Sequence, residues 1–337
     1  NQPSIETNRP YEGRPADAPV RVLYLARGEP ELYAVVRSHA PAGIELVTLD
    51  TNQDKEVYAK LPLCEVIIVA TRRLDAAMIA ACDRLRLVVH QGVGYHDTVD
   101  VPALQARGVP VAVTPDGTAT AVSEHAVMLM LAASRHLPFA DAELRSGRFH
   151  VNALRLVSHT LAGRTVGYVG MGRIGQATAH RLRAFETNGL YTDPVPLSAE
   201  QERALGLRHV GLQALLERAD LVSLHLPLTA ETRGMIGDDA LACMRRGAIL
   251  VNTARGPIVD QDALVRALER GHLGAAALDV FQHEPVGCDH PLARFSNVVL
   301  TPHIAAGTLD TYGAKIRGVF ANIDRFYAGE ALRDQVA

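Results

Sequence analysis

The sequence lacks several features that mark particular classes of protein. Its 337 residues include no tryptophan and only three lysines, and the formal net charge at pH 7 is −3. A chain so near neutrality has no basic excess with which to attract nucleic acid or an anionic membrane. The longest strictly apolar run, Ala126–Ala133, falls far short of the roughly 20 residues that cross a bilayer. We also expect no signal peptide at the start of the chain. We expect a cytoplasmic protein with no nucleic-acid or membrane partner.

Cysteine is also scarce. Cys64, Cys82, Cys243 and Cys288 form no C-x-x-C pair and no zinc-ligand spacing. We interpret them as free thiols in a reducing compartment and expect no metal. What the chain does have is length and apolar content, 48% of its residues, which suffice for about two domains with a core each.

Short apolar runs alternate with helical patterns along the first third of the chain. A polar, proline-rich stretch at 1–19 comes first, and we expect it to be an extended or disordered tail. The strands are predicted at 21–25, 44–49, 66–69, 85–89 and 109–113, and the helices at 31–39, 75–82 and 99–107. This alternation is typical of a parallel sheet covered by helices on both faces, the doubly wound α/β class.

A glycine turn opens a second series of strands and helices. The run Thr165–Val169 predicts a strand, and Gly170, Gly172 and Gly175 follow it with G-x-G-x-x-G spacing before a predicted helix. Such glycines allow a tight bend and a close approach of the backbone to a pyrophosphate, which the helix N-terminus binds. The spacing alone is weak evidence, but Asp193 ends the next predicted strand about 20 residues later, where a ribose hydroxyl needs an acceptor. Together these features predict a Rossmann domain that binds NAD.

Two further helices are expected to set the domain boundaries. A helix at 123–136, capped by Ser123 and apolar around much of its circumference, is our candidate for the link between domains. A last helix at about 307–327 would return to the first domain. We therefore predict a first, substrate-binding domain from residues 20–122 and 308–337. A second, NAD-binding domain comprises residues 123–307, with a cleft between the two.

Three strands of the second domain are predicted to lead into polar residues. Strands at 248–253, 275–280 and 298–301 are followed by Arg255, Glu284 and His303. Each residue has an ordinary explanation, as a loop cation, a solvated acid or a packed histidine. Because ligands bind at the carboxyl ends of the strands in such sheets, their joint placement favours a catalytic group. An imidazole can donate a proton, a carboxylate favours the charged imidazole, and a guanidinium can hold a carboxylate by paired bonds.

The sequence resembles the D-isomer-specific 2-hydroxyacid dehydrogenase family from about residue 20 to its end. The resemblance rests on GMGRIG (170–175), HLPLT (225–229), NTARG (252–256), ALDVFQHEP (277–285) and TPHIA (301–305). It implies a flavodoxin-like substrate domain, a Rossmann NAD-binding domain, a small 2-keto or 2-hydroxy acid substrate, and a homodimer. It also implies that Arg255 binds the substrate carboxylate, that Glu284 supports the histidine, and that His303 is the acid/base.

The same resemblance implies further site residues. Backbone amides of the loop at 92–95, with Val93 and Gly94, would hold the substrate carboxylate, and Asp279 would bind the nicotinamide amide. The full predicted cofactor set is Gly170, Gly172, Arg173, Ile174, Gly175, Asp193, Leu226, Pro227, Thr232, Thr253, Ala254, Arg255, Asp279, His303, Ala306 and Gly307. We expect no regulatory domain of the kind found on some phosphoglycerate dehydrogenases after the last helix, and therefore no feedback through such a domain.

The identity of the substrate and a second class of function stay open. Arg72, beside Arg73, could reach an anionic tail such as a phosphate, although a solvated arginine pair explains it equally well. The C-terminal-binding-protein corepressors use the same scaffold to sense NAD(H) and act through partner proteins. Within enzymes, the formate branch has glutamine at the position of Glu284, and the phosphite branch uses a lysine near 92–94. This chain has no lysine between Lys60 and Lys315, so neither branch fits well.

Overall fold

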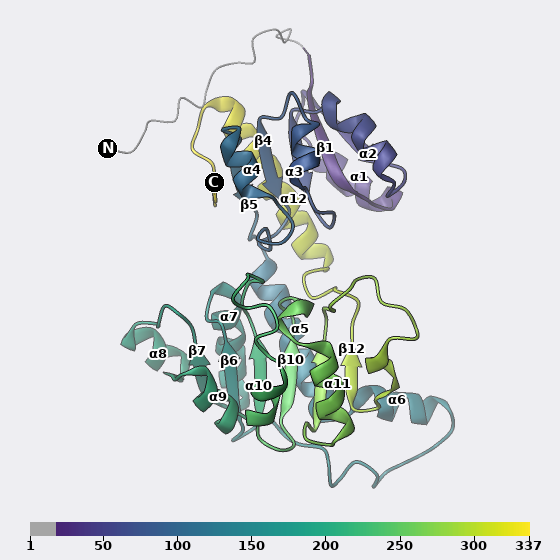
Figure 1. Cartoon of the computed structure of the whole chain (residues 1–337), viewed down its shortest axis with the longest axis vertical. Helices are drawn as coiled ribbons and strands as arrows, with labels where there is room; N and C mark the ends of the chain where they lie inside the picture. Colours follow the sequence, from purple (N-terminus) through teal and green to yellow (C-terminus); the bar gives the residue numbers. More distant parts are fainter. Residues whose placement is uncertain (1–17) are drawn as a thin grey trace. The chain divides into compact units, whose positions relative to one another are not determined.

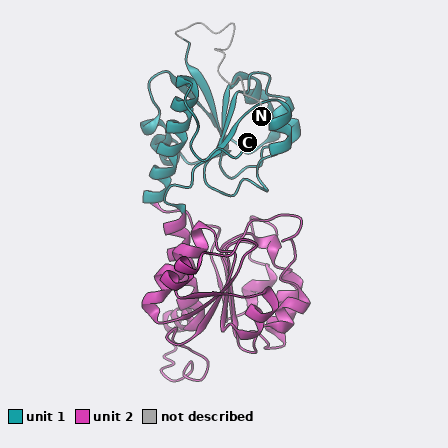
Figure 2. Cartoon of the chain, turned by 90° about the vertical axis from the view of Figure 1, so that its left-hand side faces the viewer, with its two compact units in different colours: residues 1–118, 309–337 teal, residues 119–308 magenta. Residues whose placement is uncertain are grey.

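The computed structural model describes residues 18–337, so the tail predicted at 1–19 lies almost wholly outside the described residues. The chain forms two compact units (Figure 2). Unit 1 combines the residues up to 118 with residues 309–337, and unit 2 consists of residues 119–308. Each unit is built on one sheet whose strands all pair in parallel, which confirms the predicted fold class. In the described part of the chain, no helix has the length and apolar character needed to cross a membrane.

Unit 1 contains a five-stranded sheet in the order β2-β1-β3-β4-β5. The strands are β1 (Val20–Arg27), β2 (Ile44–Leu49), β3 (Val66–Val69), β4 (Leu87–His90) and β5 (Val111–Val113). The helices are α1 (Pro30–His39), α2 (Asp54–Lys60), η1 (Leu61–Leu63), α3 (Ala76–Ala80), α4 (Val101–Ala106) and α12 (Leu309–Ala328). This strand order is that of the flavodoxin-like fold.

Helix α12 completes unit 1 although it lies at the far end of the sequence. It lies beside β4 in Figure 1 and contacts both β4 and α1. Its buried side chains Ile316, Val319, Phe320 and Ile323 join the core formed by alternate residues of β1, β3 and β4. The opposite face of the same sheet packs against α2, α3 and α4 in a separate core. Burial on both faces explains why β3 is a continuous apolar run and why β4 is apolar up to its last residue, His90.

Unit 2 contains a seven-stranded sheet in the order β12-β11-β10-β9-β6-β7-β8. The strands are β6 (Thr165–Val169), β7 (Asn188–Thr192), β8 (Leu207–His209), β9 (Leu221–Leu224), β10 (Ile249–Asn252), β11 (Ala275–Leu278) and β12 (Val298–Leu300). The strand order reverses between β6 and β9, so ligands are expected to bind at the carboxyl ends of these two strands.

The helices of unit 2 cover both faces of this sheet and bury one apolar core on each side. They are α5 (Thr118–Ser134), α6 (Leu137–Arg145), α7 (Arg173–Leu182), η2 (Arg183–Phe185), α8 (Ala199–Leu205), α9 (Leu212–Arg218), α10 (Asp238–Cys243), η3 (Gly256–Ile258), α11 (Gln261–Glu269) and η4 (Pro291–Arg294).

The predicted start of one helix is wrong. Helix α5 begins at Thr118, so Ser123 lies inside the helix and does not cap it. Its buried hydroxyl donates to the carbonyl oxygen of Thr120 at 2.8 Å. A serine before an apolar run can satisfy its hydroxyl in this way as well as by capping, and the sequence pattern does not separate the two cases.

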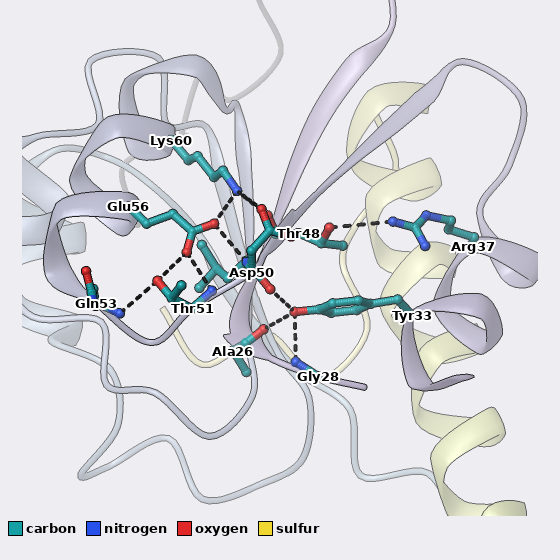
Figure 3. Close-up of polar contacts among 11 residues, drawn as sticks. Ala26, Gly28, Tyr33, Arg37, Thr48, Asp50, Thr51, Gln53, Glu56 and Lys60 are labelled. Carbon is teal, nitrogen blue, oxygen red and sulfur yellow. Dashed lines mark hydrogen bonds and ion pairs between the residues drawn. The ribbon is translucent and has the colours of Figure 1, made fainter. Parts of the chain in front are cut away.

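A polar network fixes the loops at the carboxyl ends of β1 and β2 (Figure 3). The Tyr33 hydroxyl is within hydrogen-bond distance of the carbonyl oxygens of Ala26 and Leu49, at 2.8 and 2.9 Å, and it accepts from the Gly28 N–H. Glu56 accepts from the N–H groups of Asp50 and Thr51 and pairs with Lys60. The hydrogen bond from Lys60, with those from Thr51 and Asp50, lowers the pKa of Glu56 to about 2. These loops are therefore held by an ionised carboxylate throughout the neutral range.

Candidate active site

The glycine turn of unit 2 lies at the reversal of strand order. Gly170 has a φ of +93°, a left-handed value that disfavours any side chain. A Cβ on Gly170 would lie 2.3 Å from the carbonyl oxygen of His225, and a Cβ on Gly175 would lie 2.5 Å from that of Gly170. At Gly172 a Cβ would meet no atom within 4 Å. The backbone is therefore tightly packed at Gly170 and Gly175, where no side chain would fit. At Gly172 there is free space, which a phosphate needs in order to approach the backbone.

The start of α7 and the carboxylate of Asp193 border this turn. Gly172 is the N-cap of α7, and no side chain caps the helix, so its first turn offers partial positive charge to an anion. Asp193 accepts from the N–H of Met171 at 2.7 Å and from that of Val195 at 2.9 Å. Each carboxylate oxygen retains a second lone pair for a ribose hydroxyl. These residues therefore fit a dinucleotide.

Other predicted cofactor residues follow the neighbouring strands of the same sheet. Leu226 and Pro227 lie two and three residues after the end of β9, and the hydroxyl of Thr232 donates to the carbonyl oxygen of Pro227 at 2.7 Å. Thr253 follows β10, and its buried hydroxyl has no hydrogen-bond partner within residues 18–337. A buried polar atom of this kind is expected to meet a ligand or a water. Arg173 and Ile174 begin α7, Ala254 follows Thr253, and Ala306 and Gly307 lie beyond His303.

Arg255 is presented by a turn that its neighbours determine. The side chain of Asn252, at the end of β10, donates to the carbonyl oxygen of Arg255 at 2.9 Å and accepts from the N–H of Ala254 at 3.0 Å. Gly256 lies so close to the next loop that a Cβ there would be 1.9 Å from the carbonyl group of Phe281. The role of Asn252 in positioning Arg255 was not predicted from the sequence. The feature that could have indicated this role is a polar residue at the last position of a buried strand.

Glu284 and His303 form a direct pair in unit 2. The Nδ1 atom of His303 lies 2.7 Å from Oε2 of Glu284, and the other carboxylate oxygen accepts from the Phe281 N–H at 2.9 Å. Burial alone would raise the pKa of Glu284, but the hydrogen bonds from His303 and Phe281 and the charge of Arg255 lower it. Glu284 is therefore ionised and fixes the Nδ1–H tautomer of His303. The histidine side chain is 47% exposed, and its Nε2 atom is available for proton transfer.

Asp279 is the centre of the loop that carries His303. Its side chain is 0% exposed. It accepts from the Thr301 hydroxyl at 2.6 Å and from the N–H groups of Ile304 and Ala305 at 2.9 and 2.8 Å. Burial opposes ionisation, but hydrogen bonds from His125 and from these three groups lower the pKa of Asp279. The carboxylate predicted to bind the nicotinamide amide thus also holds the His303 loop in place.

The residues predicted to bind substrate in unit 1 lie on a loop after β4. The His90 ring lies 2.9 Å from the Thr98 hydroxyl, which donates to the carbonyl oxygen of Gly94 at 2.9 Å. The Gly92 N–H lies 3.1 Å from the Thr114 hydroxyl. Val93 and Gly94 therefore occupy a loop held at both sides by hydrogen bonds.

Arg72, also in unit 1, is engaged by its own unit. It donates to the carbonyl oxygen of Asn52 at 2.7 Å and pairs with the carboxylate of Asp54. Thus the structure brings Arg255, Glu284 and His303 together on unit 2, and it places Val93, Gly94 and Arg72 on unit 1. In the described part of the chain, no group of three His, Cys, Asp or Glu side chains could hold a metal ion.

A parallel sheet with a glycine turn at its switch point, an uncapped helix and an acid after the next strand defines a dinucleotide-binding protein. Residues 127–305 match the profile of the D-isomer specific 2-hydroxyacid dehydrogenase NAD-binding domain. The chain belongs to the D-isomer-specific 2-hydroxyacid dehydrogenase family, as its motifs predict, and NAD is its cofactor.

Individual relatives agree with this assignment. A glyoxylate reductase of Korarchaeum cryptofilum is 40% identical over 279 residues, which cover 82% of this chain and 83% of that protein. A D-3-phosphoglycerate dehydrogenase of Mycobacterium tuberculosis is 40% identical over 294 residues, 87% of this chain but 55% of that protein. Among solved structures, the TT0316 protein of Thermus thermophilus matches with a TM-score of 0.83 and 34% identity. That match covers 94% of this chain and 100% of that one.

Proposed function

We propose that this protein reduces a small 2-keto acid to the 2-hydroxy acid with NADH, and catalyses the reverse oxidation, with His303 as acid/base. The observation that carries the proposal is the 2.7 Å contact between His303 and Glu284. These two residues follow β12 and β11, and Arg255 follows β10, the next strand of the same sheet. A histidine fixed by an ionised carboxylate is the arrangement that general acid catalysis at a carbonyl oxygen needs.

Each residue has a separate task in this reaction. When bound, NADH supplies a hydride to the carbonyl carbon. His303 donates a proton from Nε2 to the carbonyl oxygen, and Glu284 stabilises the imidazolium that exists before this transfer. Arg255 holds the substrate carboxylate with its planar fork of donors, which also favours the charge developing on the oxygen. In the oxidative direction, neutral His303 accepts the hydroxyl proton.

The substrate class follows from these groups and from the relatives. A carboxylate beside a carbonyl is the feature that the planar guanidinium of Arg255 would recognise. The relatives named glyoxylate reductase and D-3-phosphoglycerate dehydrogenase act on small acids of this kind, and we propose the same class here. Arg72 stays a proposal for an anionic tail, and its pairing with Asp54 makes it a weak one.

We also propose a homodimer formed through unit 2. The segment 137–157 exposes several large apolar side chains, among them Phe149, Val151 and Leu156. A hollow lined in part by Phe139, Leu154, Leu156 and Val157 lies along the same segment. Clustered apolar exposure on a protein surface indicates an interaction site, and a second copy of this chain is the partner we propose.

The central test is NADH oxidation with glyoxylate, hydroxypyruvate, pyruvate and 3-phosphohydroxypyruvate. We expect turnover with at least one acid, and a higher kcat/KM with NADH than with NADPH, because Asp193 repels a 2′-phosphate and Pro194 and Val195 provide no cation for it. His303→Ala should lose about 10²-fold or more in kcat while keeping its NADH affinity. Tight NADH binding without turnover on any acid would instead favour a dinucleotide-sensing interaction protein like the corepressors.

A further inference from the structure

Lys315 is a buried lysine for which the described residues of unit 1 offer no counter-charge. It lies on α12 and is 6% exposed, in the same helix face as the apolar residues Ile316 and Val319. Within residues 18–337, no carboxylate lies within 4.0 Å of its ammonium group, and no acceptor hydrogen-bonds to it. Asp116, whose carboxylate approaches the backbone at Gly318 on the same helix, makes no ion pair with it either.

The ammonium group faces the loop predicted to bind substrate. Gly92 has a φ of +134°, and a Cβ built on it would point at the His90 ring, 3.6 Å away, and at Nζ of Lys315, 3.9 Å away. His90 is in turn linked through Thr98 to the carbonyl of Gly94. Thus one charged group and one hydrogen-bonded loop share the small space beside Gly92.

An unpaired cation at such a position is costly for folding. Burial disfavours the charged form and lowers the pKa of Lys315 to about 8, so at neutral pH the side chain is still mostly protonated. Methionine or leucine would fill the same space on the apolar face of α12 without this cost. The ammonium is therefore best explained by an anion that binds beside it.

We propose that Lys315 is an anion-binding residue of the Gly92 loop, where it contacts a carboxylate or phosphate oxygen of the 2-keto acid substrate. The inference rests on the proposed function, since it makes the loop at 92–94 a substrate site. In this proposal the positive side chain of unit 1 that binds the anion is Lys315 on α12. It takes the role predicted for Arg72, whose guanidinium is already paired with Asp54. Two sources of the anion are possible: the carboxylate common to all 2-keto acids, or a second acidic group on the substrate.

Steady-state kinetics of Lys315→Met distinguish these sources. The substrates are glyoxylate, which has only the common carboxylate, oxaloacetate, which adds a second carboxylate, and 3-phosphohydroxypyruvate, which adds a phosphate. We expect KM to rise tenfold or more, with kcat and NADH affinity changed less than about threefold. A rise for all three acids assigns the common carboxylate, and a rise for the two charged-tail acids assigns the second group. Arg317→Met, which removes the same charge from the exposed side of α12, should leave KM unchanged.

A binding measurement tests the site without catalysis. Protein labelled with ¹³C at the lysine Cε should give three signals, from Lys55, Lys60 and Lys315, and Lys315→Met identifies the third. Inorganic phosphate should shift the Lys315 signal saturably at pH 7 and leave the other two in place. No phosphate response together with unchanged KM for every acid would overturn the proposal, as would a response without any change in KM. If the wild type reduces no 2-keto acid, the proposed function fails, and this titration still decides whether Lys315 binds anions.

Discussion

The backbone of His303 has a φ of +54°, a conformation that a histidine adopts at a cost of about 1 kcal/mol or more. Two observations explain why it persists. The His303 N–H lies 2.8 Å from the carbonyl oxygen of Asp279 and 3.0 Å from that of Thr301, and the Asp279 carboxylate holds the two residues that follow. The direction of the imidazole is therefore set by the loop, and the contact with Glu284 fixes its tautomer.

Replacing Glu284 by glutamine tests this division of roles. The glutamine keeps a hydrogen bond to Nδ1 but removes the negative charge, so the imidazolium of His303 is less favoured. Keto-acid reduction needs that imidazolium, and we expect the alkaline limb of its rate profile to begin at lower pH in Glu284→Gln. The acidic limb of 2-hydroxy acid oxidation should also extend to lower pH. Profiles of kcat in both directions check this, and unchanged limbs would mean that another group supplies the proton.

The burial of Lys315 predicts a stability change whose size depends on pH. Because the pKa of Lys315 is lowered from 10.5 to about 8 in the folded state, the folded protein carries a penalty that is full below pH 8. That penalty disappears as pH rises toward 10.5. Lys315→Met should raise the free energy of unfolding by up to about 3 kcal/mol at pH 7, and the gain should shrink between pH 8 and pH 10.

Urea unfolding of wild type and variant at several pH values measures this gain. The titratable groups on the elements packed nearby, His90, Tyr24, Tyr312 and Asp116, are present in both proteins, so the difference isolates Lys315. A gain that stays constant with pH would contradict the buried-cation account, and added phosphate should reduce the gain.

The site residues differ in how far the sequence could predict them. Arg255, Glu284 and His303 follow β10, β11 and β12, which are neighbours in the sheet, so strand order and parallel direction bring them together. Asn252 and Lys315 were not predicted, since their roles depend on contacts that the pattern does not encode. A lysine within the apolar face of the last helix was the signal available for Lys315.

At the scale of elements, the loop after β10 and the loop after β11 pack directly against each other, so a displacement of one must displace the other. A Cβ on Gly256 would lie 1.9 Å from the Phe281 carbonyl group, while the Phe281 N–H holds Glu284. Gly256→Ala must therefore separate these loops and displace both Arg255 and Glu284. We expect a loss of about 100-fold or more in kcat/KM and about 1–3 kcal/mol in the free energy of unfolding.

Kinetics and urea denaturation measure both effects. The control is Gly211→Ala, where a Cβ meets no atom within 4 Å and φ is −67°. It should leave kcat/KM unchanged, and its loss of stability should stay within about 1 kcal/mol, the cost of alanine at the N-cap of α9. Wild-type kinetics for Gly256→Ala would mean that the two loops are not coupled as their contact suggests.

The sequence predicted the buried strands and missed some short elements, among them β8 and α6, which bury no apolar face. β8 is a short edge strand whose Arg208 and His209 are exposed, so backbone pairing with β7 and not an apolar run defines it. Helix α6 has no buried residue. Its sequence therefore lacks the apolar stripe by which a helix that packs on a core is predicted. The start of α5 was misplaced for the separate reason that Ser123 bonds within the helix.

At the scale of the whole molecule, the apolar residues around α6 predict association. Leu156 is 95% exposed and Phe149 is 78% exposed, which is unfavourable for a monomer in water. We expect wild type to have the mass of a dimer, and Phe149→Asp with Leu156→Asp to halve that mass in sedimentation or light scattering. Leu63→Asp, an exposed apolar site in unit 1, is the control and should leave the mass unchanged. A monomeric wild type would remove the dimer proposal.

The return of α12 to unit 1 has a consequence for synthesis on the ribosome. Unit 2 is complete once residue 308 has emerged, whereas β1, β3 and β4 must wait for Ile316, Val319, Phe320 and Ile323 to cover one of their faces. The amino-terminal unit should therefore be the later one to fold, the reverse of the usual order along a nascent chain. Until α12 arrives, that apolar sheet face stays open to chaperones, and the docking of α12 also delivers Lys315 to the Gly92 loop.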